Sequence, residues 1–192
     1  MMQVLFLDID DVLLSARALV LEGNRRFLQS GGLSVSADAV IFDPIGIAML
    51  NRIADLADAR FVLSTSWRYT VGAAATLDAL QRNGLSARSL HTDAICPLGG
   101  ARSDGAAGKA RDIAAWLDQH PDTEAWVTLD NDPSLASLLA SKAAATRGLV
   151  IEIDPLMGIS AGDYGRALQH LGVGSDPDLL PFKAYRSSPT VA

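Results

Sequence analysis

Short runs of apolar residues recur along the chain, and each is followed by a polar stretch. The four clearest runs cover residues 4–7, 61–63, 126–129 and 149–153. Runs of this length without polar alternation are typical of strands that are buried on both faces of a parallel sheet. A fifth strand is predicted near residues 87–91, where the apolar pattern is weaker.

Helical periodicity fills the segments between the predicted strands. The helix predicted over residues 44–58 begins at Pro44 and follows Asp43, which is placed to cap it. In residues 109–119, Ala110, Ile113 and Leu117 recur at helical spacing. Further helices are predicted over residues 73–82, 133–145 and 161–171. This alternation indicates a doubly wound, mostly parallel α/β sheet with helices on both faces.

Two internal stretches and the end of the chain do not follow this alternation. The internal stretches, residues 13–42 and 92–108, are predicted to be insertions or loops over the edge of the sheet. The end is rich in proline and lacks periodicity. We therefore expect a single domain over residues 1–171, with a small cap or loop insertion at about 13–42, and a loosely attached C-terminal tail over residues 172–192.

The composition narrows the class of protein further. The chain has 192 residues, close to the usual size of one domain, and a formal net charge of -6. That charge argues against a broad basic surface for nucleic acid, although a local cationic site is compatible with it. Cys96 is the only cysteine, which excludes an internal disulfide, and no apolar run has the length of a membrane span. We expect a cytoplasmic protein without a membrane partner.

The polar residues that follow three of the strands are the candidates for chemistry, because ligands of parallel α/β sheets bind outside the carboxyl ends of the strands. They are Asp8-Ile9-Asp10-Asp11, Ser64-Thr65-Ser66-Trp67-Arg68 and Asp130-Asn131-Asp132. Asp8 and Asp10 point the same way in extended backbone, so their mutual repulsion calls for a cation. With Asp130, they form an all-oxygen set that suits Mg2+.

A lysine and hydroxyl groups would complete a site for phosphoryl transfer. Lys109 opens the helix before the Asp130 strand, and the second strand ends in Ser64 and Thr65. Fixed positive charge and hydrogen-bond donors stabilise a transferring phosphoryl group. An aspartate can itself be the nucleophile and form an aspartyl-phosphate.

These residues resemble known motifs. The segment Leu5-Phe6-Leu7-Asp8-Ile9-Asp10-Asp11-Val12-Leu13 resembles the first motif of haloacid dehalogenase (HAD)-superfamily phosphatases, and the order Asp, Thr/Ser, Lys, Asp resembles their four motifs. More narrowly, three features are similar to the HAD domains of Swiss-army-knife RNA repair proteins. They are the run at 64–68, the Lys109 helix that ends in Ala-Trp-Leu, and Leu-Asp at 129–130 followed by Ile-Asp-Pro at 153–155 and Gly158. The resemblance covers roughly residues 3–171.

The resemblance implies a role for each matching residue. Asp8 would be the nucleophile, and Asp10 the general acid that later acts as the base. Thr65 or Ser64, together with Lys109, would hold the phosphate. Asp8, Asp10 through its backbone carbonyl, and Asp130 would bind Mg2+.

Other residues near these motifs carry weaker predictions. Asp132 is either a metal ligand or a helix cap, Arg68 contacts either substrate phosphate or a helix start, and Ser66 and Asn131 are further candidates. Trp67 is expected to pack rather than to stack on a substrate base.

The chain also departs from the family pattern at two positions. Asp11 stands where the family usually has glycine, and Asn131 where many members have a second aspartate.

The resulting expectation is a Mg2+-dependent phosphomonoester hydrolase that acts through an aspartyl-phosphate. The resemblance points to phosphorylated nucleic-acid ends or nucleotides as substrates, whereas the acidic net charge favours a small metabolite such as a sugar phosphate. From another class, a signalling receiver domain gathers similar residues but meets them in a different chain order. A degenerate HAD scaffold that binds without turnover is a third alternative.

Overall fold

Five parallel strands form a single sheet in the order β3-β2-β1-β4-β5. The computed structural model describes residues 2–29, 37–99, 104–176 and 178. The strands are β1 (Met2–Leu7), β2 (Ala59–Leu63), β3 (Leu90–Ile95), β4 (Thr123–Asp130) and β5 (Gly148–Glu152). This confirms the predicted α/β class. The strand order reverses direction at β1, and such a switch point is where ligands of these folds bind.

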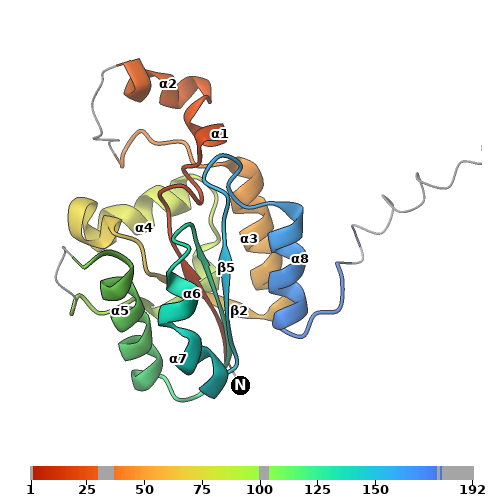
Figure 1. Ribbon diagram of the computed structural model, residues 1–192. Helices are drawn as coiled ribbons and strands as arrows, with labels where there is room; N and C mark the ends of the chain where they lie inside the picture. Colours follow the sequence, from red (N-terminus) through yellow and green to blue (C-terminus); the bar gives the residue numbers. More distant parts are fainter. Residues whose placement is uncertain (1, 30–36, 100–103, 177, 179–192) are drawn as a thin grey trace, which may run out of the picture.

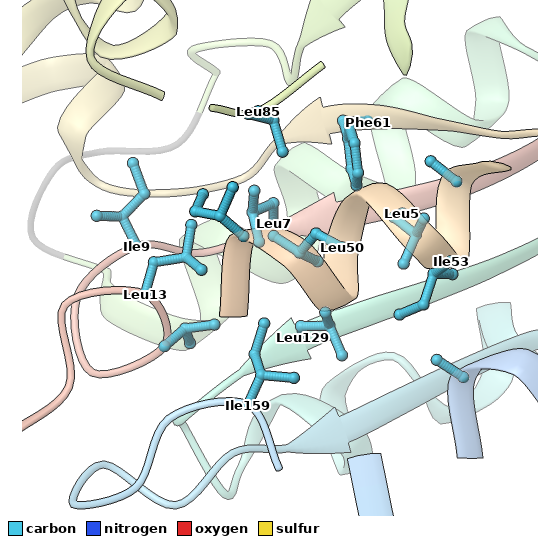
Figure 2. Close-up of a cluster of buried hydrophobic side chains, with 14 of the residues drawn as sticks. Leu5, Leu7, Ile9, Leu13, Leu50, Ile53, Phe61, Leu85, Leu129 and Ile159 are labelled. Atoms are coloured by element: carbon cyan, nitrogen blue, oxygen red, sulfur yellow. The ribbon is translucent and has the colours of Figure 1, made fainter. Parts of the chain in front are cut away.

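The helices lie in two layers, one on each face of the sheet (Figure 1). One layer holds α3 (Pro44–Ala57), α8 (Ala161–His170) and part of α4 (Ala73–Arg82), and the other holds α5 (Gly105–Gln119), α6 (Leu135–Leu138) and α7 (Ala140–Ala145). The layers bury alternate residues of the central strand. Leu5 and Leu7 of β1 face α3 (Figure 2), whereas Val4 and Phe6 face α5.

Several element boundaries differ from those predicted. Strand β3 runs over Leu90–Ile95 after a short 3-10 helix, Ala87–Ser89, and α5 begins at Gly105 rather than at Lys109. The stretch 92–108, expected to be a loop, therefore holds the end of β3 and the first turn of α5. Strand β3 lies at the edge of the sheet, where its polar residues Thr92 and Asp93 are exposed. These residues interrupt the apolar pattern by which a buried strand is recognised. The helix predicted over 133–145 is divided into α6 and α7, and a π-helical turn, Arg68–Gly72, precedes α4.

The predicted insertion carries two short helices, α1 (Ala16–Leu19) and α2 (Glu22–Gln29), which lie beyond one end of the sheet (Figure 1). Its base is closed by hydrogen bonds. The buried Asn24 amide donates to the carbonyls of Ala18 and Ile41 and accepts from the backbone N–H of Ile41. The Asp43 N–H donates to the Leu13 carbonyl at 2.9 Å. The two ends of the insertion thus leave the domain side by side. Residues 30–36 of the insertion lie outside the described residues.

A glycine allows the loop after β5 to approach the turn after β1. Gly158 has a φ of 66°, and a Cβ atom there would lie 2.7 Å from the Val12 carbonyl oxygen. A larger residue would push the two loops apart. This close approach explains why a glycine is needed at position 158, which is part of the sequence motif.

The segment after α8 is held by a buried carboxylate. Asp176 accepts hydrogen bonds from the Arg52 guanidinium at 2.8 and 3.0 Å and from the Tyr164 hydroxyl at 2.5 Å. The first residues of the expected tail are therefore anchored on α3 and α8, while 179–192 lie outside the described residues. Within the described part of the chain, no helix is both long and apolar enough to cross a membrane.

Candidate active site

The acidic residues after β1 and β4 lie side by side at the carboxyl edge of the sheet. Leu7 and Leu129 are register partners in the β1–β4 pair, and the Asp8 N–H donates to the Leu129 carbonyl at 3.2 Å. Asp8 directly follows β1, and Asp130 is the last residue of β4. Both side chains are buried. The fold thus brings these two carboxylates together as the sequence predicts.

Lys109 joins the two carboxylates. Its Nζ lies 2.5 Å from Asp8 Oδ2 and 2.6 Å from Asp130 Oδ2. Burial would lower the pKa of Lys109, but the charges of Asp8 and Asp130 outweigh that effect and raise it. The lysine is therefore a fixed positive charge at neutral pH. The first turns of α5 bring it to this point, since α5 begins at Gly105.

The cluster holds more negative than positive charge. Burial, followed by the negative charge of Asp8, raises the pKa of Asp130 to about 6, although Lys109 opposes this shift. Two buried carboxylates thus share one ammonium. A site of this kind favours a further cation or positive group close by.

Asp10 points to a different set of partners. Its Oδ1 accepts a hydrogen bond from Trp67 Nε1 at 2.9 Å, and its Oδ2 accepts one from Ser66 Oγ at 3.4 Å. Burial raises the pKa of Asp10, and the charges of Asp8 and Asp11 raise it further, against the effect of these hydrogen bonds. A carboxyl group with a raised pKa is suited to hold a proton for general acid catalysis.

Trp67 is the partner that sequence reasoning missed. Its ring is buried and packs against Phe42 at 5.7 Å, so the expectation of packing is confirmed. The indole N–H nevertheless reaches Asp10. A buried tryptophan usually needs an acceptor for this group, and that requirement was the available signal.

The two candidate hydroxyl groups after β2 differ in their surroundings. Thr65 is fully buried, and its Oγ1 accepts a hydrogen bond from the Trp67 backbone N–H at 3.3 Å. Ser64 is also fully buried, and its Oγ has no hydrogen-bond partner within the described residues. Ser64 lies in the wall of a cleft beside Lys109. Of the two hydroxyl groups, that of Ser64 is therefore the one without a hydrogen-bond partner among the described residues.

The cleft opens beside the carboxylates and has a volume of about 350 Å³. Its walls come from the loops after β2 and β4 and from the start of α5. They are formed by Ser64, Ser66, Arg68, Tyr69, Gly105, Ala106, Gly108, Lys109, Asp112, Asn131, Asp132 and Pro133. Of the predicted phosphate-binding residues, Ser64 and Lys109 line this cleft, whereas Thr65 does not. The carboxylates of Asp8, Asp10 and Asp130 are not part of the wall either.

Arg68 is held by protein groups on all sides. Its guanidinium donates to the carbonyls of Thr65, Cys96, Pro97 and Ser64 and to the Asp112 carboxylate. These contacts occupy all five N–H groups of the side chain. Tyr69 also donates to Asp112, at 2.8 Å. This arrangement agrees with neither prediction for Arg68, because the guanidinium is buried and its acceptors are loop carbonyls and the carboxylate of Asp112 on α5. Arg68 therefore has a structural role that the sequence did not predict. Sequence reasoning gave no role to Asp112 and Tyr69, because no motif contains them.

The turn after β4 holds the remaining candidates. The Asp132 carboxylate accepts hydrogen bonds from the Ser134 N–H at 2.9 Å and from the Ser134 hydroxyl at 2.6 Å, and these lower the pKa of Asp132. Its contacts are those of a helix-start residue. Asn131 Nδ2 donates to Asp11 Oδ2 at 3.0 Å, so the two positions that depart from the family pattern touch each other.

The donor set partly matches the predicted magnesium site. Within the described residues, no three His, Cys, Asp or Glu side chains are grouped closely enough to hold a metal ion, because Asp10 faces Trp67 and Ser66. Asp8 and Asp130 do converge on a single cation, the Lys109 ammonium. Magnesium is commonly bound through one or two carboxylates together with waters and substrate phosphate. Two convergent carboxylates therefore fit the needs of hydrated Mg2+.

The fold and the site together define a class of protein. A parallel sheet of order 3-2-1-4-5, with a lysine that bridges the Asp residues at the carboxyl ends of β1 and β4, is a HAD-type arrangement. The family model for the HAD domain in Swiss Army Knife RNA repair proteins matches residues 4–164. The chain belongs to this family, which indicates phosphatase-type hydrolase chemistry in general. No curated protein and no solved structure matches the chain.

Proposed function

We propose that the protein is a Mg2+-dependent phosphomonoesterase that works through an aspartyl-phosphate on Asp8. The observation that carries this proposal is that Lys109, which lines an open cleft, contacts both Asp8 and Asp130. The strand order also speaks against the receiver alternative, because receiver domains have the order 2-1-3-4-5.

In the first step, the Asp8 carboxylate attacks the phosphorus of the monoester, and the bond from phosphorus to the ester oxygen breaks. Asp10 gives its proton to that oxygen, which leaves as an alcohol. Asp10, now ionised, takes a proton from a water molecule that attacks the aspartyl-phosphate. Inorganic phosphate leaves, and the Asp8 carboxylate is restored.

Other residues would hold the phosphoryl group during these steps. Lys109 supplies fixed positive charge, and the Ser64 or Thr65 hydroxyl donates a hydrogen bond to a phosphoryl oxygen. Asp8, Asp130 and the backbone carbonyl of Asp10 would hold Mg2+, which supplies positive charge that stabilises the phosphoryl oxygens when it is bound.

Two substrate classes are supported by different observations. The cleft is open, which favours a large substrate such as a phosphorylated nucleic-acid end, or a nucleotide. The net charge of -6 and the carboxylate of Asp132 in the cleft wall favour a small sugar phosphate instead. The family match makes nucleic-acid ends the first candidate.

The basic activity is tested by phosphate release from an aryl phosphate, with Mg2+ and with a chelator. We expect release that needs Mg2+ and that Asp8→Asn lowers by about a thousandfold or more. Asp122→Asn is the matched control, since Asp122 is exposed in the turn before β4, at the opposite edge of the sheet. Full activity of Asp8→Asn, or no release from a broad panel of phosphomonoesters, would contradict the proposal.

The substrate class is tested separately at matched salt, because contacts to a nucleic-acid backbone weaken as salt rises. Phosphate release is compared among 3'- and 5'-phosphorylated oligonucleotides, mononucleotides and sugar phosphates. A higher kcat/KM for the oligonucleotides supports the nucleic-acid end. A higher value for the sugar phosphates would establish the small-metabolite alternative.

A further inference from the structure

The contact between Asp11 and Asn131 joins the turn that carries Asp8 and Asp10 to the loop that follows Asp130. Asp11 lies three residues after Asp8, in the turn that follows β1, and Asn131 directly follows Asp130 at the end of β4. The hydrogen bond of 3.0 Å between them is partly buried. Asn131 also forms part of the cleft wall. The contact therefore lies beside the reacting groups.

The backbone of Asp11 shows why this position is demanding. Its φ is 61°, in the left-handed region that glycine adopts most easily. The turn is closed by the Asp11 N–H bonding to the Leu14 carbonyl and by the Leu13 and Leu14 N–H groups bonding to the Ile9 carbonyl. Glycine would adopt this shape without strain but would offer no side chain to Asn131. Aspartate accepts the strain and gains a hydrogen bond across to β4.

The charges make the two residues depend on each other. The Asn131 amide can donate to the Asp11 carboxylate, whereas an aspartate at position 131 would place a second carboxylate at the same short distance. Two carboxylates so close together cannot both stay ionised without a large cost. An acid at position 11 thus requires a neutral donor at position 131.

We propose that Asp11 and Asn131 are positioning residues that hold the Asp8–Asp10 turn and the Asp130 loop at a fixed separation. We call the Asp11–Asn131 hydrogen bond the clasp. Apart from it, the described contacts between the two loops are the backbone hydrogen bond from Asp8 to Leu129 and the Lys109 bridge. Both of those contacts lie close to Asp8. The Asp11–Asn131 contact ties the outer part of the turn to the β4 loop, while Trp67 and Ser66 hold the Asp10 side chain from the β2 side. Its catalytic consequence rests on the proposed phosphatase function.

The test exchanges the two side chains. Asn131→Asp alone places two carboxylates in contact, and we expect kcat for an aryl phosphate to fall by about tenfold with little change in KM. The double variant Asp11→Asn/Asn131→Asp restores an amide-to-carboxylate hydrogen bond with its direction reversed and keeps the wild-type net charge. Asparagine also tolerates the left-handed backbone. We expect the double variant to recover kcat to within about threefold of wild type.

Thermal unfolding of the same proteins without Mg2+ gives a readout that does not need activity. The midpoint should fall in Asn131→Asp and recover in the double variant. Full kcat in Asn131→Asp would overturn the proposal, and so would a double variant no better than that single variant in both kcat and midpoint. If the wild type shows no phosphatase activity, the proposed function fails, while the thermal comparison still supports or overturns the clasp.

Discussion

Two cations, the buried Arg68 and the partly buried Lys109, lie in the walls of the same cleft, and their surroundings differ. Arg68 has a protein acceptor for every N–H group, and only Asp112 among these acceptors is charged. Lys109 instead contacts two carboxylates and leaves the cluster with excess negative charge. The Arg68 cluster thus has its hydrogen bonds satisfied within the protein, whereas the Lys109 cluster holds an excess of negative charge that a bound cation would balance.

The comparison shows that burial of a charge does not by itself identify an active site. Arg68 and Lys109 both belong to the segments that resemble family motifs, and both line the cleft. The balance of charge and the number of free bonding positions separate a structural ion pair from a site prepared for a substrate. The two clusters should therefore respond differently to substitution.

The largest effect is expected for Lys109→Met. Removal of a fixed positive charge that stabilises a transition state costs about 3 to 4 kcal/mol, which lowers kcat/KM by about a hundredfold to a thousandfold. Steady-state phosphate release from an aryl phosphate measures this loss. Lys142→Met is the matched control, because Lys142 also pairs with an aspartate, Asp118, but lies on α7 outside the cleft wall. If Lys109→Met kept a third or more of wild-type activity, Lys109 would not differ from Arg68 in its importance for catalysis.

Arg68→Lys should lower stability more than it lowers catalysis. Lysine has three donors where arginine has five, so buried carbonyls lose their partners and Asp112 loses part of its compensation. We expect the free energy of unfolding to fall by about 2 to 3 kcal/mol, as measured by urea denaturation. The exposed Arg88, paired with Asp55, provides the control, and Arg88→Lys should change the value by less than about 0.5 kcal/mol. Equal effects of the two substitutions would contradict the structural role of Arg68.

A smaller, pH-dependent effect is expected at the second complete cluster, around Asp176. Hydrogen bonds from Arg52 and then from Tyr164 hold the pKa of Asp176 well below its usual range. A lowered carboxyl pKa adds stability above the unfolded value of about 3.9, and this stability is lost as the pH falls through the folded value. The thermal midpoint of the wild type should therefore be higher than that of Asp176→Asn near neutral pH. The difference between the two midpoints should shrink below about pH 4. A gap that widens in acid would show that another group is responsible.

Much of the fold could be predicted from hydrophobic pattern because the buried strands of a parallel sheet are apolar on both faces. Helix α3 matches its prediction within one residue at the C-terminal end, since Asp43 and Pro44 mark its start clearly. Strand β3 and the first turn of α5 were harder to predict. The edge strand carries exposed polar residues, and glycines at positions 105 and 108 weaken the helical signal.

The site was predictable to the extent that its residues belong to local motifs. Asp8, Asp130 and Lys109 meet as expected, because parallel strands end at a common edge. The contact of Trp67 with Asp10 depends on how the chain turns after β2, and no spacing rule encodes that turn. The same holds for Asp112, which is aligned with Arg68 only by the packing of α5 on the sheet.

The closed base of the insertion has a consequence for how this protein can evolve. Because hydrogen bonds join Asn24 to Ile41, the part of the insertion between these two residues can change in length at little cost to the core. Loop closure becomes only slightly less favourable as a loop grows. Selection can thus change the approach to the cleft by lengthening, shortening or replacing this part of the insertion, while the acids at the strand ends and Lys109 on α5 keep their geometry.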